Sequence, residues 1–581
     1  GGRDAGRDAA VDAGSCTASE ELCALWAAEE AAKADELPLP PGATGTLSSM
    51  LHFSPARRAS TWVAGPTSDD VTVQVRDYEG IFGAPIGGAS PVQALSTRRY
   101  AEDPAAYTIW GATLTRGYRF VVSGARFEAL DLFDINTFFA PSLPWNIVAL
   151  DDGRVIVPDT DGHRVPESGP CRTTDPSLVV FRDDDRLDGS VRCEKSVALT
   201  PAALREACGL RFGRLRPGFT GNSQVRGFGG EHVTTALFDV EDVERAFMIV
   251  MDGDLEGILA CGAIDESAPS NEIAAEPGSE GRTFFYVPAG NALVKMVYDP
   301  RARTVTRAWA RGDGFRQRTG TTPTLVNAPD GRRFVVVVDG PCATSNIVNG
   351  LITCDEDAGR ARLVAVRRED ELAGEPSVQF TELPEAIRTV ENSPASRRDW
   401  VFVANYSGYL PNGLVVPPGG TPPEGGVSTW GVSPDAAPDV ARGIVGLRYD
   451  VAARGFVVAW TDLETQVSGI PSVSGGANMV YGTGAEEATG KTYVYGWRWL
   501  ADEGGPAGER LLRIEVGDAP FRTPTTDASG NRIFRFGDYE LAEGEVYDAG
   551  NSLAIGIDGS LFMSMGRALV RVRPNRPPRP E

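Results

Sequence analysis

The stretch Gly320–Asn346, GTTPTLVNAPDGRRFVVVVDGPCATSN, indicates the fold more clearly than any other part of the chain. A Thr-Pro pair precedes a short apolar strand, Asp330-Gly331 marks a turn, and Phe334–Val338 is one Phe followed by four Val residues. Two apolar strands joined by an Asp-Gly turn are typical of an antiparallel hairpin. The unbroken apolar run further predicts a strand that is buried on both faces.

Looser versions of this unit recur along the chain at spacings of roughly 40–80 residues, which indicates a repeat architecture. In each unit a small or polar residue, often Asn, precedes a short apolar strand, a Gly-containing turn and further strands. The units begin near Tyr107, Asn146, His232, Asn271, Thr322, Asn392, Ile470 and Asn551. Four-stranded sheets at this spacing are the blades of a β-propeller, so we expect an all-β fold with about eight blades. Seven blades, or a pair of β-sandwiches, are the alternatives.

The repeats divide the chain into four segments. Residues 1–16 form a low-complexity tether of Gly, Asp, Ala and Arg, and residues 17–45 hold a helix and a Pro-rich connector. A capping box at the start of ELCALWAAEEAAKADE predicts that helix. Residues 46–575 form the propeller, and residues 576–581 form a Pro/Arg tail.

Two local predictions concern the propeller segment. A short helix, AALREAC, is expected after Thr200-Pro201, because Pro is favoured in the first turn of a helix. The strands of about residues 46–100 are expected to pair with the last unit, NSLAIGIDGSLFMSMG, since propellers commonly share one blade between the two ends of the chain.

Composition argues against several functional classes. The chain of 581 residues carries a net charge of −23 at pH 7. Such an acidic surface repels phosphates, so no nucleic-acid partner is expected. No run approaches the ~18 apolar residues of a membrane span, so no transmembrane segment is expected. The chain has 3 histidines and no CxxCH motif, which argues against copper centres and haem.

The eight cysteines lie in groups that are local in sequence, and none forms a CxxC pair. Zinc ribbons therefore lack their spacing, and disulfides are favoured over free thiols. The expected pairs are Cys16–Cys23, Cys171–Cys193, Cys208–Cys261 and Cys342–Cys354. Disulfides imply an oxidising compartment. The tether is similar in composition to those that follow the lipidated cysteine of bacterial lipoproteins, so we expect an exported protein in the periplasm, on the outer-membrane surface or secreted, lipid-anchored through a cysteine upstream of Gly1.

One set of candidate site residues is catalytic. His232 follows Gly229-Gly230-Glu231 and is the best candidate for a general base, with Glu231 and Asp339 as weaker candidates. The alternative interpretation of His232 is a hydrogen-bonded turn histidine. A fragment of a calcium loop precedes His163, but a hairpin turn explains it better because the loop's third ligand position and its Glu are missing.

A second set consists of polar residues near strand starts. These candidate ligand-binding residues are Asn146, Asn271, Thr322, Asn346, Asn392 and Asn551. All but Asn346 begin strands that would line a central channel, where amides and hydroxyls can hold calcium or a small ligand. Glu272 and Glu391 are the candidate metal ligands, and Asp339 would add charge. The alternative is that these side chains satisfy backbone groups at strand ends.

Four segments of the C-terminal half carry a resemblance to a known family. The opening stretch resembles the GTTPTL…D-FVVITDG…MN segment of bacterial quinoprotein-like, eight-bladed propeller proteins. Three further segments are similar to the same family: SNEIAAEPGSEGRTFFYVPAGNALVKMVYD, SGIPSVSGGANMVYGTG and NSLAIGIDGSLFMSMGRALVRVRP. The resemblance covers about residues 271–574 and implies the fold and an extracytoplasmic location, but no reaction.

This chain also departs from related families. In the loop after Asp339-Gly340, this chain has Pro341–Ser345, which includes Cys342 and differs from the quinoprotein-like pattern. Pyrroloquinoline quinone dehydrogenases, which resemble this fold, carry adjacent cysteines and regular Trp motifs. Both are missing from this sequence, so this cofactor is not expected.

Together these observations favour an exported binding or assembly module. Its ligand, a protein partner or a small molecule, would dock at the channel mouth or on the loop face. The first alternative is a channel-mouth enzyme, either a quinoprotein-like oxidoreductase or a metal-assisted hydrolase or lactonase. The second alternative is a subunit of a cell-envelope complex.

Overall fold

A computed structural model describes residues 46–48, 56, 71–77, 89–134, 147–159, 169–264, 272–316, 321–354, 360–404, 444–462, 480–482, 492–500, 508–516, 532–535 and 554–575, with short gaps inside several of these ranges. In these ranges the chain is nearly all β. The regular exceptions are helix α3 (Pro201–Ala207) and a single 3-10 turn, η2 (Ser279–Gly281). The all-β prediction is therefore confirmed. The predicted tether, the N-terminal helix and the tail of residues 576–581 lie outside the described residues.

The described strands form eight antiparallel sheets, numbered here I to VIII, and one separate hairpin. Sheet I contains β1 (Thr46–Ser48), β3 (Ala89–Ser96), β4 (Tyr107–Thr113), β5 (Arg116–Ser123) and β6 (Arg126–Asp134). Sheet II contains β7 (Val148–Ala149), β8 (Arg154–Asp159), β9 (Ser177–Asp183) and β10 (Val191–Ala198). Sheet III contains β11 (Arg214–Leu215), β12 (Gln224–Arg226), β13 (His232–Val240), β14 (Val243–Met251) and β15 (Ile258–Ala263). Sheet IV contains β16 (Ala274–Pro277), β17 (Thr283–Ala289), β18 (Ala292–Asp299) and β19 (Thr304–Arg311).

The second half of the chain repeats the pattern. Sheet V contains β20 (Thr324–Asn327), β21 (Arg333–Asp339), β24 (Arg362–Arg367) and β25 (Val378–Glu382). Sheet VI contains β26 (Ala395–Arg397), β27 (Trp400–Ala404), β28 (Ile444–Asp450) and β29 (Gly455–Asp462). Sheet VII contains β30 (Val480–Gly482), β31 (Thr492–Leu500), β32 (Gly508–Val516) and β33 (Arg532–Arg535). Sheet VIII contains β34 (Ala554–Ile555), β35 (Leu561–Met565), β36 (Ala568–Pro574) and β2 (Val71–Asp77).

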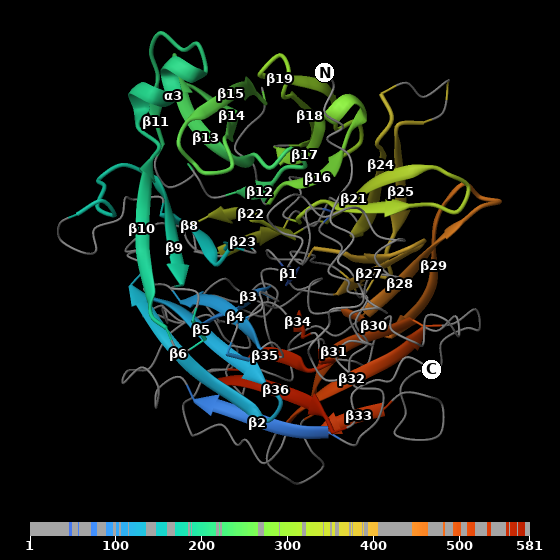
Figure 1. Ribbon diagram of the computed structural model, residues 1–581. Helices are drawn as coiled ribbons and strands as arrows, with labels where there is room; N and C mark the ends of the chain where they lie inside the picture. Colours follow the sequence, from blue (N-terminus) through green and yellow to red (C-terminus); the bar gives the residue numbers. More distant parts are fainter. Residues whose placement is uncertain are drawn as a thin grey trace, which may run out of the picture.

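The sheets follow one another around a common centre in chain order, from blue to red in Figure 1. First strands of neighbouring sheets touch, as β7 touches β12, β12 touches β16, and β20 touches β26. Last strands touch as well, as β15 touches β19 and β25 touches β29. Hydrophobic clusters fill the spaces between sheets, and one of them joins sheets II, III and IV.

Strand β21 shows why the opening stretch is apolar without alternation. Val335 and Val337 belong to the cluster that sheet V shares with sheet IV. Phe334, Val336 and Val338 belong to the cluster that it shares with sheet VI. Because both faces are covered, every position in the strand is buried, and each such side chain stabilises the fold by about 1.5–3 kcal/mol.

The two ends of the chain meet in sheet VIII. Strand β2 pairs with β36 over seven residues, from Val71 opposite Pro574 to Asp77 opposite Ala568. The prediction that early strands join the C-terminal unit is confirmed for β2. Strands β1 and β3, from the same early region, pair into sheet I instead.

Several local predictions are confirmed and one is wrong. Helix α3 begins after Thr200, whose hydroxyl accepts a hydrogen bond from the N–H of Ala203 at 3.2 Å. Gly153, with φ of 84°, supplies the turn between β7 and β8. The unit expected to begin at His232 begins earlier, because β11 and β12 both precede β13 and pair with it in sheet III. A strand of three residues is too short to leave a pattern in the sequence.

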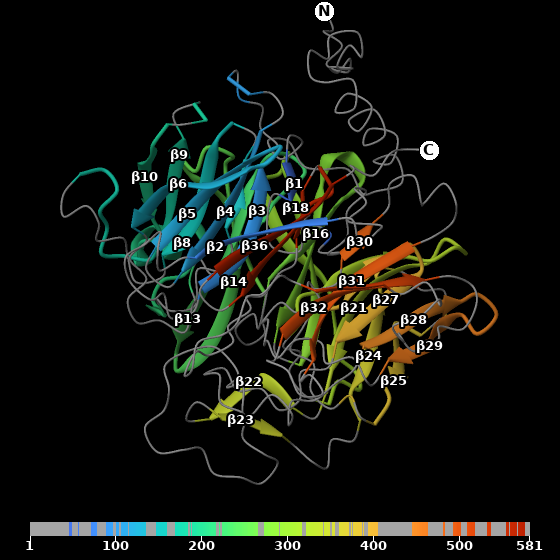
Figure 2. The same cartoon turned by 90° about the horizontal axis from the view of Figure 1, so that it is seen from below.

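A hairpin interrupts sheet V between β21 and β24. Strands β22 (Cys342–Val348) and β23 (Leu351–Cys354) pair with each other, and the chain then returns to β24. The hairpin lies near the centre in Figure 1 and beyond the edge of the sheets in Figure 2, so it stands off one face. Its register places Cys342 opposite Cys354, as the predicted staple requires.

Two of the predicted disulfides are confirmed. Cys171 is bonded to Cys193, and Cys208 is bonded to Cys261. The predicted Cys16–Cys23 pair lies outside the described residues, and the bond between Cys342 and Cys354 stays a prediction. Disulfides persist in oxidising environments, so the two bonds indicate an extracytoplasmic protein.

Carboxylates join neighbouring sheets by a recurring arrangement. At four junctions a Tyr hydroxyl donates to a carboxylate that an Arg also contacts. The sets are Tyr100, Arg119 and Asp183; Tyr107, Arg571 and Asp558; Tyr286, Arg368 and Glu276; and Tyr449, Arg332 and Asp330. Burial, above all, raises the pKa of Tyr100, Tyr107 and Tyr286, so these phenols stay protonated and donate.

Candidate functional site

His232 is a core residue. It begins β13 opposite Arg226, has no exposed surface, and its Nε2 lies 2.9 Å from Oε1 of Gln224. Burial, together with the charge of Arg226, lowers its pKa to about 3. A general base must reach the proton that it removes. The fully buried, neutral imidazole fits the hydrogen-bonded interpretation and argues against a catalytic role.

The pKa of His232 predicts a pH dependence of stability. The unfolded chain binds a proton at this residue below about pH 6.5, whereas the folded chain does not until about pH 3. Stability therefore falls as the pH is lowered through this window, by up to about 1.4 kcal/mol per pH unit from this residue. We expect His232→Gln to flatten the slope of unfolding free energy between pH 6.5 and 4.5 in urea titrations. Equal slopes in the variant and the wild type would contradict this assignment.

The other two catalytic candidates are also buried in structural contacts. Glu231 is 4% exposed and accepts a hydrogen bond from the hydroxyl of Thr283 at 2.7 Å, which links sheets III and IV. Its carboxylate occupies the space where a side chain at Gly227 would lie, since a Cβ there would come within 2.1 Å of Oε1. Asp339 is 1% exposed and pairs with Arg362 at 2.7 Å. Neither carboxylate is presented to solvent.

The described part of the second candidate set is also buried. The N–H of Thr322 donates to Oγ of Ser393 at 2.8 Å, and Thr324 donates to the carbonyl of Pro394 at 2.7 Å. These bonds join the starts of β20 and β26, as the strand-end interpretation expected. Glu272 is 2% exposed and precedes β16.

The remaining polar candidates cannot be placed. Asn146, Asn271, Asn392, Asn551 and Glu391 lie outside the described residues, and Asn346 lies on β22 with its side chain not described. Over the described ranges, no three His, Cys, Asp or Glu side chains form a group that could hold a metal ion.

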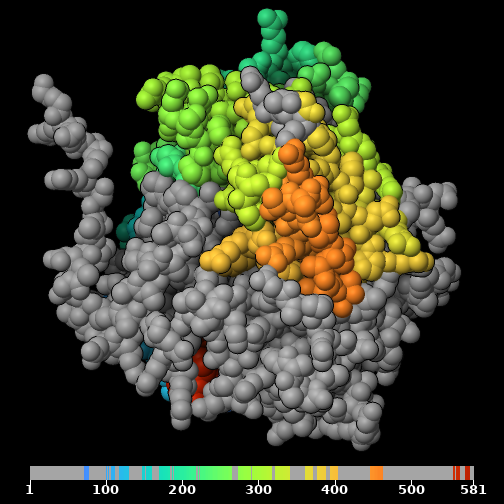
Figure 3. Space-filling model, turned by 90° about the vertical axis from the view of Figure 1, so that its right-hand side faces the viewer, coloured from blue at the N-terminus to red at the C-terminus, as the bar shows by residue number. Residues whose placement is uncertain are grey.

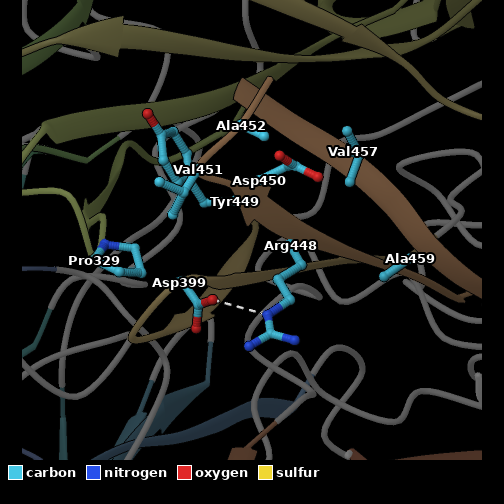
Figure 4. A pocket seen from close by; sticks show the side chains of 9 residues that line it. All are labelled: Pro329, Asp399, Arg448, Tyr449, Asp450, Val451, Ala452, Val457 and Ala459. Atoms are coloured by element: carbon cyan, nitrogen blue, oxygen red, sulfur yellow. Dashed lines mark hydrogen bonds and ion pairs between the residues drawn. The ribbon is translucent and has the colours of Figure 1, made fainter. Parts of the chain in front are cut away.

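A cavity of about 510 Å³ lies where turns of sheets V and VI meet. Its apolar wall consists of Pro329 from sheet V and Val451, Ala452, Val457 and Ala459 from the β28–β29 region. Figure 4 shows Val457 and Ala459 on one side, Pro329 and Val451 on the other, and polar side chains between them. The lining of the cavity is therefore partly apolar and partly charged.

The charged part of the lining is grouped around Arg448. Its Nε donates to Oδ2 of Asp399 at 2.9 Å, and its guanidinium lies 5.5 Å from the ring centre of Trp400. Asp399 is 14% exposed, whereas Arg448 is 42% exposed. Asp450 adds a second carboxylate, which accepts a hydrogen bond from the N–H of Ala453 at 2.8 Å. A ligand with an apolar body and a charged group fits this combination.

Tyr449 ties the cavity to the junction between sheets V and VI. Its hydroxyl points away from the other lining side chains in Figure 4 and donates to Oδ2 of Asp330 at 2.9 Å. Burial and this bond raise the pKa of Tyr449, so the hydroxyl remains a donor. Desolvation opposes ionisation of Asp330, but the N–H of Arg332, Tyr449 and the Arg332 charge lower its pKa. The wall of the cavity is therefore held in place by a charged hydrogen-bond network.

The sequence interpretation missed the residues of this cavity. GFVVAWTD was interpreted only as a strand, and Asp399 and Arg448 belong to no motif. One signal was available. Three successive apolar residues, Val457–Ala459, in a last strand leave apolar side chains on the outside unless another sheet covers them.

Comparisons with known proteins name no relative. No family model matches the chain, and no curated protein matches it. One similar solved structure is a functionally unknown protein from Desulfotomaculum acetoxidans, with 11% identity, a TM-score of 0.31, and coverage of 72% of this chain and 96% of the other. Another is Sqt1 from Chaetomium thermophilum, with 11% identity, a TM-score of 0.38, and coverage of 86% and 99%. Likeness at this level supports no statement about function. Of the helices that the structure describes, none has the length and apolar character to cross a membrane.

Proposed function

We propose that this chain is an exported, eight-bladed β-propeller that acts as a binding module and docks its ligand or partner in the cavity at the turns of sheets V and VI. The propeller assignment is supported by eight sheets arranged around one centre and by the β2–β36 pairing, which joins the two ends of the chain. The resemblance of residues 271–574 to quinoprotein-like propellers is a further argument for it.

The cavity is the observation that carries the binding assignment. It combines exposed apolar side chains with the Arg448–Asp399 pair and the Asp450 carboxylate. Binding sites of small ligands and of partner side chains share this composition of apolar walls with a few placed polar groups. The catalytic candidates Glu231, His232 and Asp339 are instead buried in contacts between strands and sheets, which favours binding over catalysis.

A fragment screen tests the proposal. We expect small apolar amines and carboxylates to give ligand-detected NMR signals with the wild type and to lose them with Ala459→Trp, whose indole fills the cavity. Ala459 is exposed, so the variant is expected to fold. Ala308→Trp, on the exposed side of β19, is the matched control and should keep every signal. The same hits with both variants would refute the site.

Calcium and pyrroloquinoline quinone serve as the comparison for the enzyme alternative. A rise of several degrees in melting temperature with either would indicate that it binds the folded protein, and would favour a channel-mouth enzyme. The binding-module proposal expects no such rise.

A further inference from the structure

The outer edge of β29 carries little charge. Last strands expose backbone groups that can pair with another chain, and charged residues on the strand normally prevent this. Strand β19 carries Arg307 and β10 carries Glu194 and Lys195 inside the strand, whereas the one charge of β25, Glu382, lies at its end. Strand β29, GFVVAWTD, has one charged residue, Asp462 at its end.

Strand β15 carries no charge and is protected in a different way. Strand β15, ILACGA, is covered by helix α3, which contacts it and is bonded to it through Cys208–Cys261. This comparison covers the last strands that the structure describes. Strand β29 has neither a charge in its body nor a helix over it, a feature that it shares with β25 and β33.

The exposed side chains of β29 are apolar. Val457 is 39% exposed, Val458 is 37% exposed, and Val451 in the preceding turn is 53% exposed. The strand lies on the molecular surface, in orange in Figure 3. Water contact of three neighbouring valines is unfavourable, and burying them against a partner would recover about 25 cal/mol per Å².

Two side chains of β25 occupy the first part of the β29 edge. Gln379 of β25 donates to the carbonyl of Arg454 at 2.9 Å, and Thr381 donates to the carbonyl of Phe456 at 2.7 Å. Beyond Phe456, β29 pairs with β28 alone among the described strands. Among the described strands, none pairs with the outer side of β29 beyond Phe456, where the exposed Val457 and Val458 lie.

The cavity adjoins this edge. Val457 and Ala459 are two residues apart, and both line the cavity on the same side in Figure 4. Strand addition uses this combination, in which main-chain bonds to an edge give affinity and a pocket beside the edge accepts alternate side chains.

The negative charge of the protein favours a partner segment with basic side chains. The chain carries a net charge of −23, and the Asp450 carboxylate lines the cavity with no cation paired to it in the part of the chain that the structure describes. An incoming strand with basic side chains is attracted by this field, and an acidic strand is repelled.

We propose that the β29 edge binds an extended segment of a partner polypeptide as an added strand, with an apolar side chain in the cavity and a basic side chain beside Asp450. This inference rests on the proposed binding function and specifies its partner.

The test uses a fluorescein-labelled peptide, acetyl-Lys-Val-Lys-Val-Thr-Val-Lys-amide, followed by fluorescence polarisation. Saturable binding is expected. It should weaken by about tenfold or more when alternate peptide nitrogens are methylated, because main-chain donors are lost, and when Glu replaces Lys. Val458→Lys should weaken binding to a similar extent, and Ala308→Lys on β19 should leave it unchanged.

Each contrary outcome has a definite meaning. Equal binding of the methylated peptide, or equal binding by Val458→Lys, overturns strand addition. A wild-type dimer in light scattering that Val458→Lys converts to a monomer assigns the edge to a second copy of this chain and also overturns the proposal. Loss of all peptide binding, with fragment binding in the cavity retained, refutes this inference and leaves the proposed function standing.

Discussion

Replacing Arg368 by Met is expected to lower the free energy of unfolding by about 3–5 kcal/mol, because it leaves a buried carboxylate without its cation. Arg368 contacts Glu276, and the two side chains are 0% and 3% exposed. Tyr286 donates to the same carboxylate at 2.5 Å, but a phenol supplies no charge to offset it. Urea unfolding followed by tryptophan fluorescence measures the effect.

Two further variants distinguish the loss of the Arg368–Glu276 pair from an unspecific loss of stability. The double variant Arg368→Met, Glu276→Gln removes the buried charge together with its partner and should recover part of the loss. Arg360→Met breaks the pair with Glu385, in which the side chains are 51% and 73% exposed, and should cost less than about 1 kcal/mol. A loss for Arg368→Met no larger than that for Arg360→Met would show that the junction does not depend on this pair.

Removing the Cys208–Cys261 disulfide should cost about 4 kcal/mol, because the bond closes a loop of 53 residues in the unfolded chain. It also joins Cys208, the C-cap of α3, to β15. A helix of 7 residues is not stable alone, so we expect α3 to lose hydrogen-exchange protection first in the Cys208→Ser, Cys261→Ser variant.

The second disulfide provides the matched comparison. Cys171–Cys193 closes a loop of 22 residues, so its removal should cost about 0.8 kcal/mol less than removal of Cys208–Cys261. Chemical denaturation of the two double-serine variants measures both values. A larger loss for the shorter loop would mean that local contacts, and not loop closure, dominate the stabilisation.

Short-range features were predictable because they depend on neighbours in sequence. Thr200 and Pro201 start a helix by themselves, and Asp152-Gly153 makes a turn by its own backbone preferences. The two confirmed disulfides join cysteines that are 22 and 53 residues apart. The apolar run of Phe334–Val338 required cover on both faces, and the neighbouring sheets supply it.

The roles of the polar candidates were not predictable in the same way. His232, Glu231 and Asp339 have the chemistry of acid–base residues, but their partners come from elsewhere in the chain: Gln224, Thr283 and Arg362. Pairing and burial turn these side chains into structural contacts. A single sequence does not reveal which charged groups will meet across sheets.

The sequence by itself determined that the chain folds into repeated antiparallel sheets, since strand periodicity and turn residues act over a few positions. Only the tertiary structure decided which strand edge and which cavity are exposed to solvent. Val457 and Val458 have the same chemistry as Val335 and Val337, yet the first two are exposed and the second two are buried. The difference lies in whether another sheet stands opposite them, and that depends on how distant parts of the chain pack together.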